Sequence, residues 1–330
     1  MKEILIILDG LMEEKLEGYS FKELLLGNLD IKFKEEMKDF SVKGKDIDSL
    51  NCIMNILGYP ADKVHIGERA FYEGLNRGII IKENQSILRC NIVKINKGIL
   101  EDFTGGNLVE NIRDVLKDFN IEDGRLYPCY KYKNLLVLNT MLDVELYPPH
   151  FHIGEEVKGL IPKDKLINKI IMDSYKFFKE RDMEGCMFWP WGISKEILLE
   201  PYSRKAGVIT GIDLVAGIGK ALGMKVIQPK GATGDYNTNL KGKLIGVFQL
   251  MNEAEQLIVH INALDELAHR KDFKGKLDYI KIIRKEFLVP LLSKVKDEKD
   301  WEVKITCDHR TDSFTGRHEE GKVPFMNIFN

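Results

Sequence analysis

Cysteine is scarce and scattered in this sequence. The chain has five cysteines, and no two of them form a Cys-x-x-Cys pair (Cys52, Cys90, Cys129, Cys186 and Cys307). An odd, dispersed set of this kind is typical of reduced thiols rather than of a disulfide framework. The cysteines therefore predict a cytoplasmic protein.

An excess of charge of one sign is also lacking. The 49 Lys and Arg residues nearly balance the 51 Asp and Glu residues, which gives a net charge of -2. Bulk electrostatics therefore predict neither nucleic acid nor a membrane surface as a partner. The N-terminal apolar run, residues 4–8, is too short for a signal-peptide core or a bilayer span. No internal repeat or low-complexity tract is present.

Short apolar runs and amphipathic stretches make up most of the chain. Its 330 residues, 44% of them hydrophobic and 30% charged, suit a globular protein of one large or two ordinary domains. Each run ends at a glycine or a polar group, and helical stretches lie between the runs (residues 4–8, 186–189, 207–210, 224–227, 257–261, 303–306 and 323–328). This alternation predicts an α/β fold, with a mostly parallel sheet flanked by helices on both faces.

One part of the chain has a different texture. From about residue 86, predicted strands and turn-rich segments follow one another without this regular alternation. We therefore expect a discontinuous core, residues 1–77 and 163–330, and an inserted smaller α+β domain, residues 78–162. Within the core, the charged segment 33–39 is predicted to be helical.

Two polar residues near the N-terminus allow two interpretations each. Asp9 follows the apolar run 4–8 and precedes Gly10, so it is either a turn residue or a group presented at the end of a buried strand. Ser49 precedes a helical pattern that ends at Gly58. It is either the N-cap of that helix or, near a metal ion, an activated nucleophile.

Histidines and aspartates gather after two predicted strands. Asp265 and His269 are four residues apart on one helical face, so both can bind one ion. Asp308 and His309 follow the strand at 303–306, and His318 comes nine residues later. Three of the seven histidines therefore lie in these motifs. We expect them to form a metal site.

Imidazole and carboxylate ligands favour Zn, Mn or Mg over metals that select thiolates. Two neighbouring divalent ions would stabilise both the attacking and the leaving oxygen of a phosphoryl displacement. Such a site also needs cationic side chains for the phosphate. Arg69 and Arg89 are candidates, although either can equally be a solvated surface residue.

Further motifs point to a known family. They are Ile-Leu-Asp9-Gly10, Leu57-Gly58-Tyr59-Pro60, Gly67-Glu-Arg69, Leu88-Arg89-Cys90-Asn91, Phe188-Trp-Pro-Trp191-Gly192, Asp213-Leu-Val-Ala-Gly217-Ile-Gly219, Lys230-Gly-Ala-Thr-Gly-Asp-Tyr-Asn-Thr238-Asn, Asp265-Glu-Leu-Ala-His269, Asp308-His309, and His318 followed by Val323-Pro324. In this order and spacing they run over nearly the whole chain. The chain resembles the archaeal-type, cofactor-independent (2,3-bisphosphoglycerate-independent) phosphoglycerate mutases of the alkaline phosphatase superfamily.

The resemblance implies an alkaline-phosphatase-like core, two divalent metal ions and no organic cofactor. It implies one metal site made of Asp9, Ser49, Asp308 and His309, and a second made of Asp265, His269 and His318. It further implies that Ser49 carries the phosphoryl group between 3-phosphoglycerate and 2-phosphoglycerate, a small phosphorylated acid substrate. The inserted domain would close over that substrate. Arg69, Arg89 and His150 are the expected substrate-binding residues.

The chain departs from the family pattern near the expected nucleophile and on the substrate side. Asp48-Ser49-Leu50 replaces the usual Gly-Ser-Asp, and the usual Asp-Pro-His is here Pro148-Pro149-His150. Two alternatives to the mutase therefore stay open. One is another metal-dependent phosphotransferase or phosphohydrolase, such as a homoserine-kinase-like enzyme, and the other is a non-catalytic relative. The sequence does not indicate an oligomeric state.

Overall fold

The structure is a computed structural model that describes residues 1–106, 112–296, 298 and 300–329. The chain divides into two compact units. The first combines Met1–Ile66 with Leu198–Asn330, and the second is Gly67–Ile197. The chain therefore leaves the first unit once and later returns to it.

The second unit is longer than the predicted insertion at residues 78–162. It begins at Gly67 and ends at Ile197, so it also contains α5 (Lys165–Lys179) and β7 (Cys186–Ser194). The reason is that β7 pairs with β3 (Ser86–Asn96) and α5 packs on β7. The predicted core segment that starts at residue 163 thus joins the first unit only from Leu198 onward.

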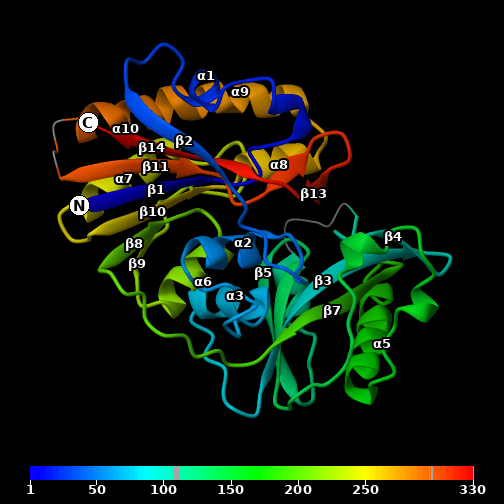
Figure 1. Ribbon diagram of the computed structural model, residues 1–330. Helices are drawn as coiled ribbons and strands as arrows, with labels where there is room; N and C mark the ends of the chain where they lie inside the picture. The colour runs from blue at the N-terminus through cyan, green and yellow to red at the C-terminus, as the bar shows by residue number, and fades with distance from the viewer. Residues whose placement is uncertain (107–111, 297, 299, 330) are drawn as a thin grey trace. The chain divides into compact units, whose positions relative to one another are not determined.

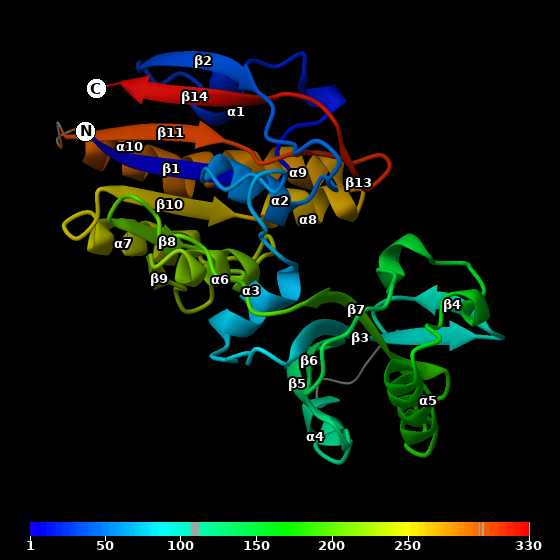
Figure 2. The same ribbon diagram turned by 60° about the horizontal axis from the view of Figure 1, so that its bottom comes forward.

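A seven-stranded sheet, visible in Figures 1 and 2, forms the centre of the first unit. The strand order is β2-β14-β11-β1-β10-β8-β9, and all pairs from β11 to β9 are parallel. At one edge β14 is antiparallel to β11, and β2 is antiparallel to β14. The strands are β1 (Lys2–Leu8), β2 (Lys32–Lys38), β8 (Ala206–Ile209), β9 (Lys225–Ile227), β10 (Gln256–Ile261), β11 (Trp301–Thr306) and β14 (Val323–Phe329). The predicted mostly parallel α/β sheet is confirmed.

Helices cover both faces of this sheet, as predicted. Gly219 on α6 lies over Val208, whereas Gly246 on α7 lies over Ile209. Successive residues of a strand point to opposite faces, so α6 and α7 lie on opposite sides of β8. The α-helices of the unit are α1 (Phe21–Leu25), α2 (Ser49–Ile56), α6 (Asp213–Ala221), α7 (Leu240–Leu250), α8 (Ala263–His269), α9 (Phe273–Ile283) and α10 (Val289–Val295).

Strand β1 lies in the middle of the sheet, between β10 and β11. Ile7 on β1 is paired with His260 on one side and with Thr306 on the other. Residues 4–8 of β1 are all buried, which explains their uninterrupted apolar run. Because the three strands are parallel, their carboxyl ends lie next to one another at the same edge of the sheet.

The predicted helix at residues 33–39 is wrong, because this segment forms the edge strand β2. It pairs along its whole length with β14, from Lys32 opposite Phe329 to Lys38 opposite Val323. Lys and Glu favour helices when a segment stands alone, but pairing with a neighbouring strand overrides that preference here. Charged side chains on an edge strand also discourage pairing with other molecules.

The second unit is built on an antiparallel sheet with α+β architecture. Its strand order is β4-β3-β6-β5, with β7 also paired to β3. The apolar run 186–189 was expected in the parallel sheet, but it belongs to β7 in this second sheet. The remaining α-helices and strands of the unit are α3 (Arg69–Asn76), β4 (Ile99–Asp102), α4 (Ile112–Leu116), β5 (Gly124–Tyr130) and β6 (Lys133–Leu138).

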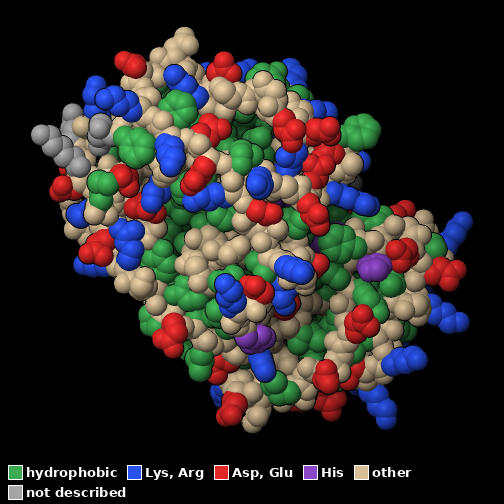
Figure 3. Space-filling model, in the orientation of Figure 1, with side chains coloured by type: hydrophobic (Ala, Val, Ile, Leu, Met, Phe, Trp, Pro, Cys, Tyr) green, Lys and Arg blue, Asp and Glu red, His purple; other side chains and the backbone are tan. Residues whose placement is uncertain are grey.

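Acidic and basic side chains are interspersed over the face drawn in Figure 3, in line with the net charge of -2. Among the described residues, the structure contains no helix whose length and hydropathy would let it cross a membrane.

Candidate metal centre

Side chains from three neighbouring strand ends meet at the carboxyl edge of the first unit's sheet. Asp9 follows β1, and the pair Asp308-His309 follows β11. Asp265 and His269 lie on α8, the helix that directly follows β10. The last histidine, His318, is on β13 (Arg317–Glu319), opposite Thr311 of β12 (Arg310–Asp312).

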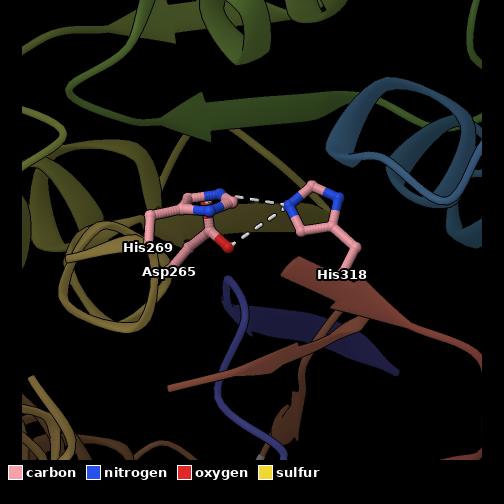
Figure 4. A group of neighbouring side chains, drawn as sticks. All are labelled: Asp265, His269 and His318. Atoms are coloured by element: carbon pink, nitrogen blue, oxygen red, sulfur yellow. Dashed lines mark hydrogen bonds and ion pairs between the residues drawn. The ribbon is translucent and has the colours of Figure 1, made fainter. Parts of the chain in front are cut away.

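Asp265, His269 and His318 form one cluster, shown in Figure 4. Nε2 of His269 is 3.1 Å from Asp265 Oδ2, and Nε2 of His318 is 3.5 Å from Asp265 Oδ1. The two Nε2 atoms are 3.2 Å apart. Each ring donates its Nδ1–H to a backbone carbonyl, of Gly316 at 2.8 Å and of Ile47 at 2.6 Å. Both Nε2 lone pairs therefore face the carboxylate.

These separations fit a bound cation. Two Nε2 lone pairs repel each other at 3.2 Å unless a proton or a metal ion lies between them. Zinc bonds of about 2.0–2.1 Å in a tetrahedral site place ligand atoms roughly 3.3–3.4 Å apart. The backbone bonds at Nδ1 fix the ring orientation, as is usual for metal-binding histidines.

Without a cation, a proton on the imidazole of His269 balances the negative charge of Asp265. Burial alone would lower the pKa of His269. Its hydrogen bond and charge interaction with Asp265 outweigh this effect and raise the pKa to about 9. Burial raises the pKa of Asp265, while hydrogen bonds from His269 and His318 bring it well below its usual range. Asp265 is therefore an ionised carboxylate, the form that binds a metal.

Asp9, Ser49, Asp308 and His309 form the second group of close side chains. Nε2 of His309 is 3.4 Å from Asp9 Oδ1, 3.5 Å from Asp308 Oδ2 and 3.5 Å from Ser49 Oγ. Ser49 Oγ is 3.4 Å from Asp9 Oδ2. All four residues are buried, and Asp308 Oδ2 has no hydrogen-bond partner among the described residues. A carboxylate oxygen left in this way suits a metal ligand.

Ser49 is not the N-cap of its helix. Asp48 is the N-cap of α2, and its side chain accepts a hydrogen bond from the backbone N–H of Asn51. Ser49 is the first helical residue. Of the two interpretations of Ser49, the N-cap is therefore wrong, because the adjacent aspartate takes that position. The Ser49 hydroxyl is therefore directed to Asp9 and His309 instead of to its own backbone.

His260 was missed in the sequence. It lies on β10, is fully buried, and its Nε2 is 3.0 Å from Asp9 Oδ2. Together with Asp9 and Asp308 it forms a further group that could hold an ion. Its backbone carbonyl accepts a hydrogen bond of 2.6 Å from Nζ of Lys243, which is also buried. The signal in the sequence was a single imidazole inside the otherwise apolar run at residues 257–261.

The second unit contains all three expected substrate-binding residues, Arg69, Arg89 and His150. Glu73 connects the two arginines, and the indole of Trp191 connects Arg89 with His150. Glu73 Oε1 is 3.6 Å from Arg69 Nε, and its Oε2 is 3.2 Å from Arg89 Nε. The Arg89 guanidinium lies 4.5 Å from the ring centroid of Trp191, and the His150 ring centroid is 5.5 Å from the same residue. These three candidates thus form one cluster of their own.

The fold and the candidate metal centre together define the class of protein to which the first unit belongs. The first unit is an α/β structure in which candidate metal ligands and a buried serine meet at the carboxyl edge of a parallel sheet.

Comparison with known proteins shows one family to which the chain is similar. Residues 40–184 match the family model for 2,3-bisphosphoglycerate-independent phosphoglycerate mutase. Enzymes of that name from Methanothrix thermoacetophila and Methanosarcina barkeri are 28% and 29% identical to the chain. The alignments cover 86% and 82% of this chain and 76% and 74% of those enzymes. Over most of its length the chain is similar to the 2,3-bisphosphoglycerate-independent phosphoglycerate mutases.

Two solved structures have the same fold. A protein from Pyrococcus horikoshii aligns with a TM-score of 0.75 at 19% identity, covering 100% of this chain and 87% of its own. The cofactor-independent phosphoglycerate mutase from Thermoplasma acidophilum aligns with a TM-score of 0.58 at 16% identity, covering 100% of this chain and 90% of its own. At these identities the likeness concerns the fold.

Proposed function

We propose that the chain is a metal-dependent phosphoglycerate mutase that interconverts 3-phosphoglycerate and 2-phosphoglycerate through a phosphoserine at Ser49. The relatives named as phosphoglycerate mutases support the reaction. The observation that carries the role of Ser49 is its position, with Oγ 3.4 Å from Asp9 and 3.5 Å from His309.

Two divalent cations fit the side chains of the metal centre. One would be held by Asp9, Ser49, Asp308 and His309, and the other by the cluster of Asp265, His269 and His318. Bound there, they would neutralise phosphoryl charge and lower the pKa of the serine hydroxyl. The ligand set of carboxylates and imidazoles accepts Mn, Zn or Mg.

The reaction then proceeds in two transfers. Ser49 Oγ forms a bond to phosphorus while the bond from phosphorus to the C3 oxygen breaks, and the serine proton ends on that oxygen. The free glycerate turns, and its C2 oxygen attacks the phosphoserine. The bond to Ser49 Oγ breaks, and the proton of the C2 hydroxyl returns to the serine. No phosphate is lost if water is kept from the phosphoserine.

The second unit supplies the expected substrate-binding residues. Arg89 is held from two sides, by Glu73 at 3.2 Å and by the Trp191 ring at 4.5 Å. A planar guanidinium fixed in this way can recognise a carboxylate or a phosphate through two parallel hydrogen bonds. We propose that Arg69, Arg89 and His150 bind the phosphorylated acid and that this unit covers it during the transfer.

The proposal is tested with purified protein stripped by chelator and reloaded with Mn, Zn or Mg. Phosphorus NMR follows 3-phosphoglycerate directly, so it separates 2-phosphoglycerate from inorganic phosphate. Formation of 2-phosphoglycerate only in reloaded protein is the expected result. If none of the metals gives 2-phosphoglycerate, the mutase assignment is wrong.

Another phosphoryl-transfer reaction is the second candidate. It is favoured by the sequence Asp48-Ser49-Leu50, in which Asp48 is committed to capping α2 through its bond to Asn51. The same experiment distinguishes the two, because a phosphohydrolase releases inorganic phosphate without isomerisation. A panel of other phosphoesters and hydroxyl acceptors then identifies the substrate.

A further inference from the structure

The hydroxyl of Thr311 lies between the two groups of the metal centre. Thr311 is fully buried on β12. Its Oγ1 is 2.7 Å from Asp265 Oδ1 and 3.2 Å from His309 Nδ1. A single hydroxyl therefore contacts one expected ligand of each ion.

The chemistry of the three groups fixes the direction of both hydrogen bonds. An ionised carboxylate only accepts hydrogen bonds, and a threonine hydroxyl has one proton to donate. Thr311 therefore donates to Asp265 and accepts from the Nδ1–H of His309. The neutral His309 ring is then the Nδ1–H tautomer, which leaves its Nε2 lone pair facing Asp9 and Ser49.

The backbone of Thr311 is held on both sides. Its N–H donates to the carbonyl of Met12 at 2.9 Å, and its own carbonyl accepts from Lys276 Nζ at 2.9 Å. Lys276 is paired at 2.8 Å with Glu13, and both side chains are fully buried. Glu13 also accepts from the backbone N–H and the hydroxyl of Ser313. The segment after β1, helix α9 and strand β12 are thus joined around this one residue.

Space around the hydroxyl is tightly limited as well. A Cβ at Gly10 would come within 2.7 Å of both Thr311 Oγ1 and Asp265 Oδ1, and Gly10 has a φ of +63°. The chain end of β1 therefore closes over the hydroxyl and leaves no room for a different rotamer of Asp265 on that side.

We propose that Thr311 is a positioning residue that orients Asp265 and His309 together and thereby couples the affinities of the two ion sites. The inference rests on the proposed function in one respect, namely that both groups bind divalent cations. Without the hydroxyl, Asp265 Oδ1 and His309 Nδ1–H both lose the partner that holds them in place. Bonds of this kind to metal ligands typically change metal affinity by about 10–100-fold.

The test titrates Mn or Zn alone into chelator-stripped protein by calorimetry, using Thr311→Val, Thr311→Ser and the wild type. We expect Thr311→Val to weaken both ions by roughly 10–100-fold and Thr311→Ser to bind like the wild type. Thr306→Val is the matched control. Thr306 is also fully buried, but its hydroxyl contacts two backbone carbonyls, of Pro324 at 2.9 Å and of Cys307 at 3.1 Å, and none of the ligand side chains.

Unchanged affinities in Thr311→Val overturn the inference, and so does a loss confined to one ion. If Thr311→Val does not fold, Thr311→Ala removes the same hydroxyl with less volume in the site. The nitrogen-15 spectrum of metal-free wild type at pH 8 gives a second readout, because an Nε2–H tautomer of His309 also overturns the inference. Absence of any cation binding by the wild type contradicts the proposed function itself.

Discussion

The Nε2 atoms of His269 and His318 lie 3.2 Å apart, and both face the carboxylate of Asp265. The two histidines are 49 residues apart in the chain, one on a helix and the other on a strand. A backbone carbonyl holds each ring from behind. Such convergence of two lone pairs on one acid is favourable only with a positive charge between them.

Replacing one of these rings should therefore remove one bound ion. We expect His318→Ala to retain one divalent ion where the wild type retains two, measured by elemental analysis after gel filtration. Two ligands alone hold a divalent ion poorly, whereas the group around His309 is left intact. His65→Ala is the matched control, because His65 is exposed and lies outside both groups. A variant that still carries two ions would contradict this ligand assignment.

Ser49→Ala should stop turnover, while Asp9, Asp308 and His309 should still hold the ion next to it. Loss of a nucleophile typically lowers kcat by several orders of magnitude, and we expect at least roughly a 10³-fold loss here. Quenched wild type incubated with 3-phosphoglycerate should carry a phosphoryl group on the peptide that contains residue 49, as mass spectrometry can show. Ser41→Ala serves as control, since the Ser41 hydroxyl binds Asp39 outside the metal centre. A phosphoryl group on a different residue would rule out the role of Ser49.

Arg89→Met should raise KM for the phosphorylated acid by roughly 10–100-fold. This increase corresponds to the loss of about one charge-assisted hydrogen bond to the substrate. The metal content should not change, because Arg89 lies in the second unit. Arg89→Lys should not restore binding, since an ammonium cannot reproduce the planar contact with Trp191. Arg125→Met is the control, as Arg125 is exposed and contacts Tyr127. An unchanged KM in Arg89→Met would refute this role of Arg89.

Because of Lys243, the free energy of unfolding should rise with pH between about 7 and 10.5. Burial lowers the pKa of Lys243 to about 7, against 10.5 for the unperturbed side chain. The unfolded chain therefore binds one more proton between these two pH values, and the free energy of unfolding increases with pH across that window. From a shift of this size the increase is on the order of a few kcal/mol. Below pH 7 the ammonium is charged in both states, and this contribution no longer varies.

Urea unfolding at pH 7, 8.5 and 10 measures this effect. We expect Lys243→Met to lose the rise that the wild type shows. Lys241→Met, on the exposed side of the same helix, should keep it. Parallel pH profiles for wild type and Lys243→Met would show that the Lys243 amine keeps its ordinary pKa.

The part of the fold that the sequence predicted is the part with a local signature. Residues 4–8 of β1 and all of β10 are buried and mostly apolar, whereas β11 alternates apolar residues with Glu302 and Lys304. Strand β2 has no such signature, because its partner β14 lies almost 300 residues away. The run in β7 was recognised as a strand, but an apolar run does not specify which sheet the strand joins.

The same distinction applies to the metal centre. Asp265 and His269 could be paired from their spacing on one helix, which is a local property. His318 is brought to them by the pairing of β13 with β12, and His260 is hidden inside a buried strand. Thr311 has no signal in the sequence at all, since its role depends on two side chains that reach it from other segments.

The position of β1 in the middle of its sheet has a consequence for biosynthesis. The ribosome makes β1 long before its neighbours β10 and β11, which begin only at Gln256 and Trp301. At about 5–20 residues per second, the nascent chain carries an unpaired apolar strand for roughly 12–50 s. The uninterrupted segment Gly67–Ile197 emerges complete during that delay. Translation therefore favours early folding of the second unit, while β1 stays without its sheet neighbours until synthesis is almost finished.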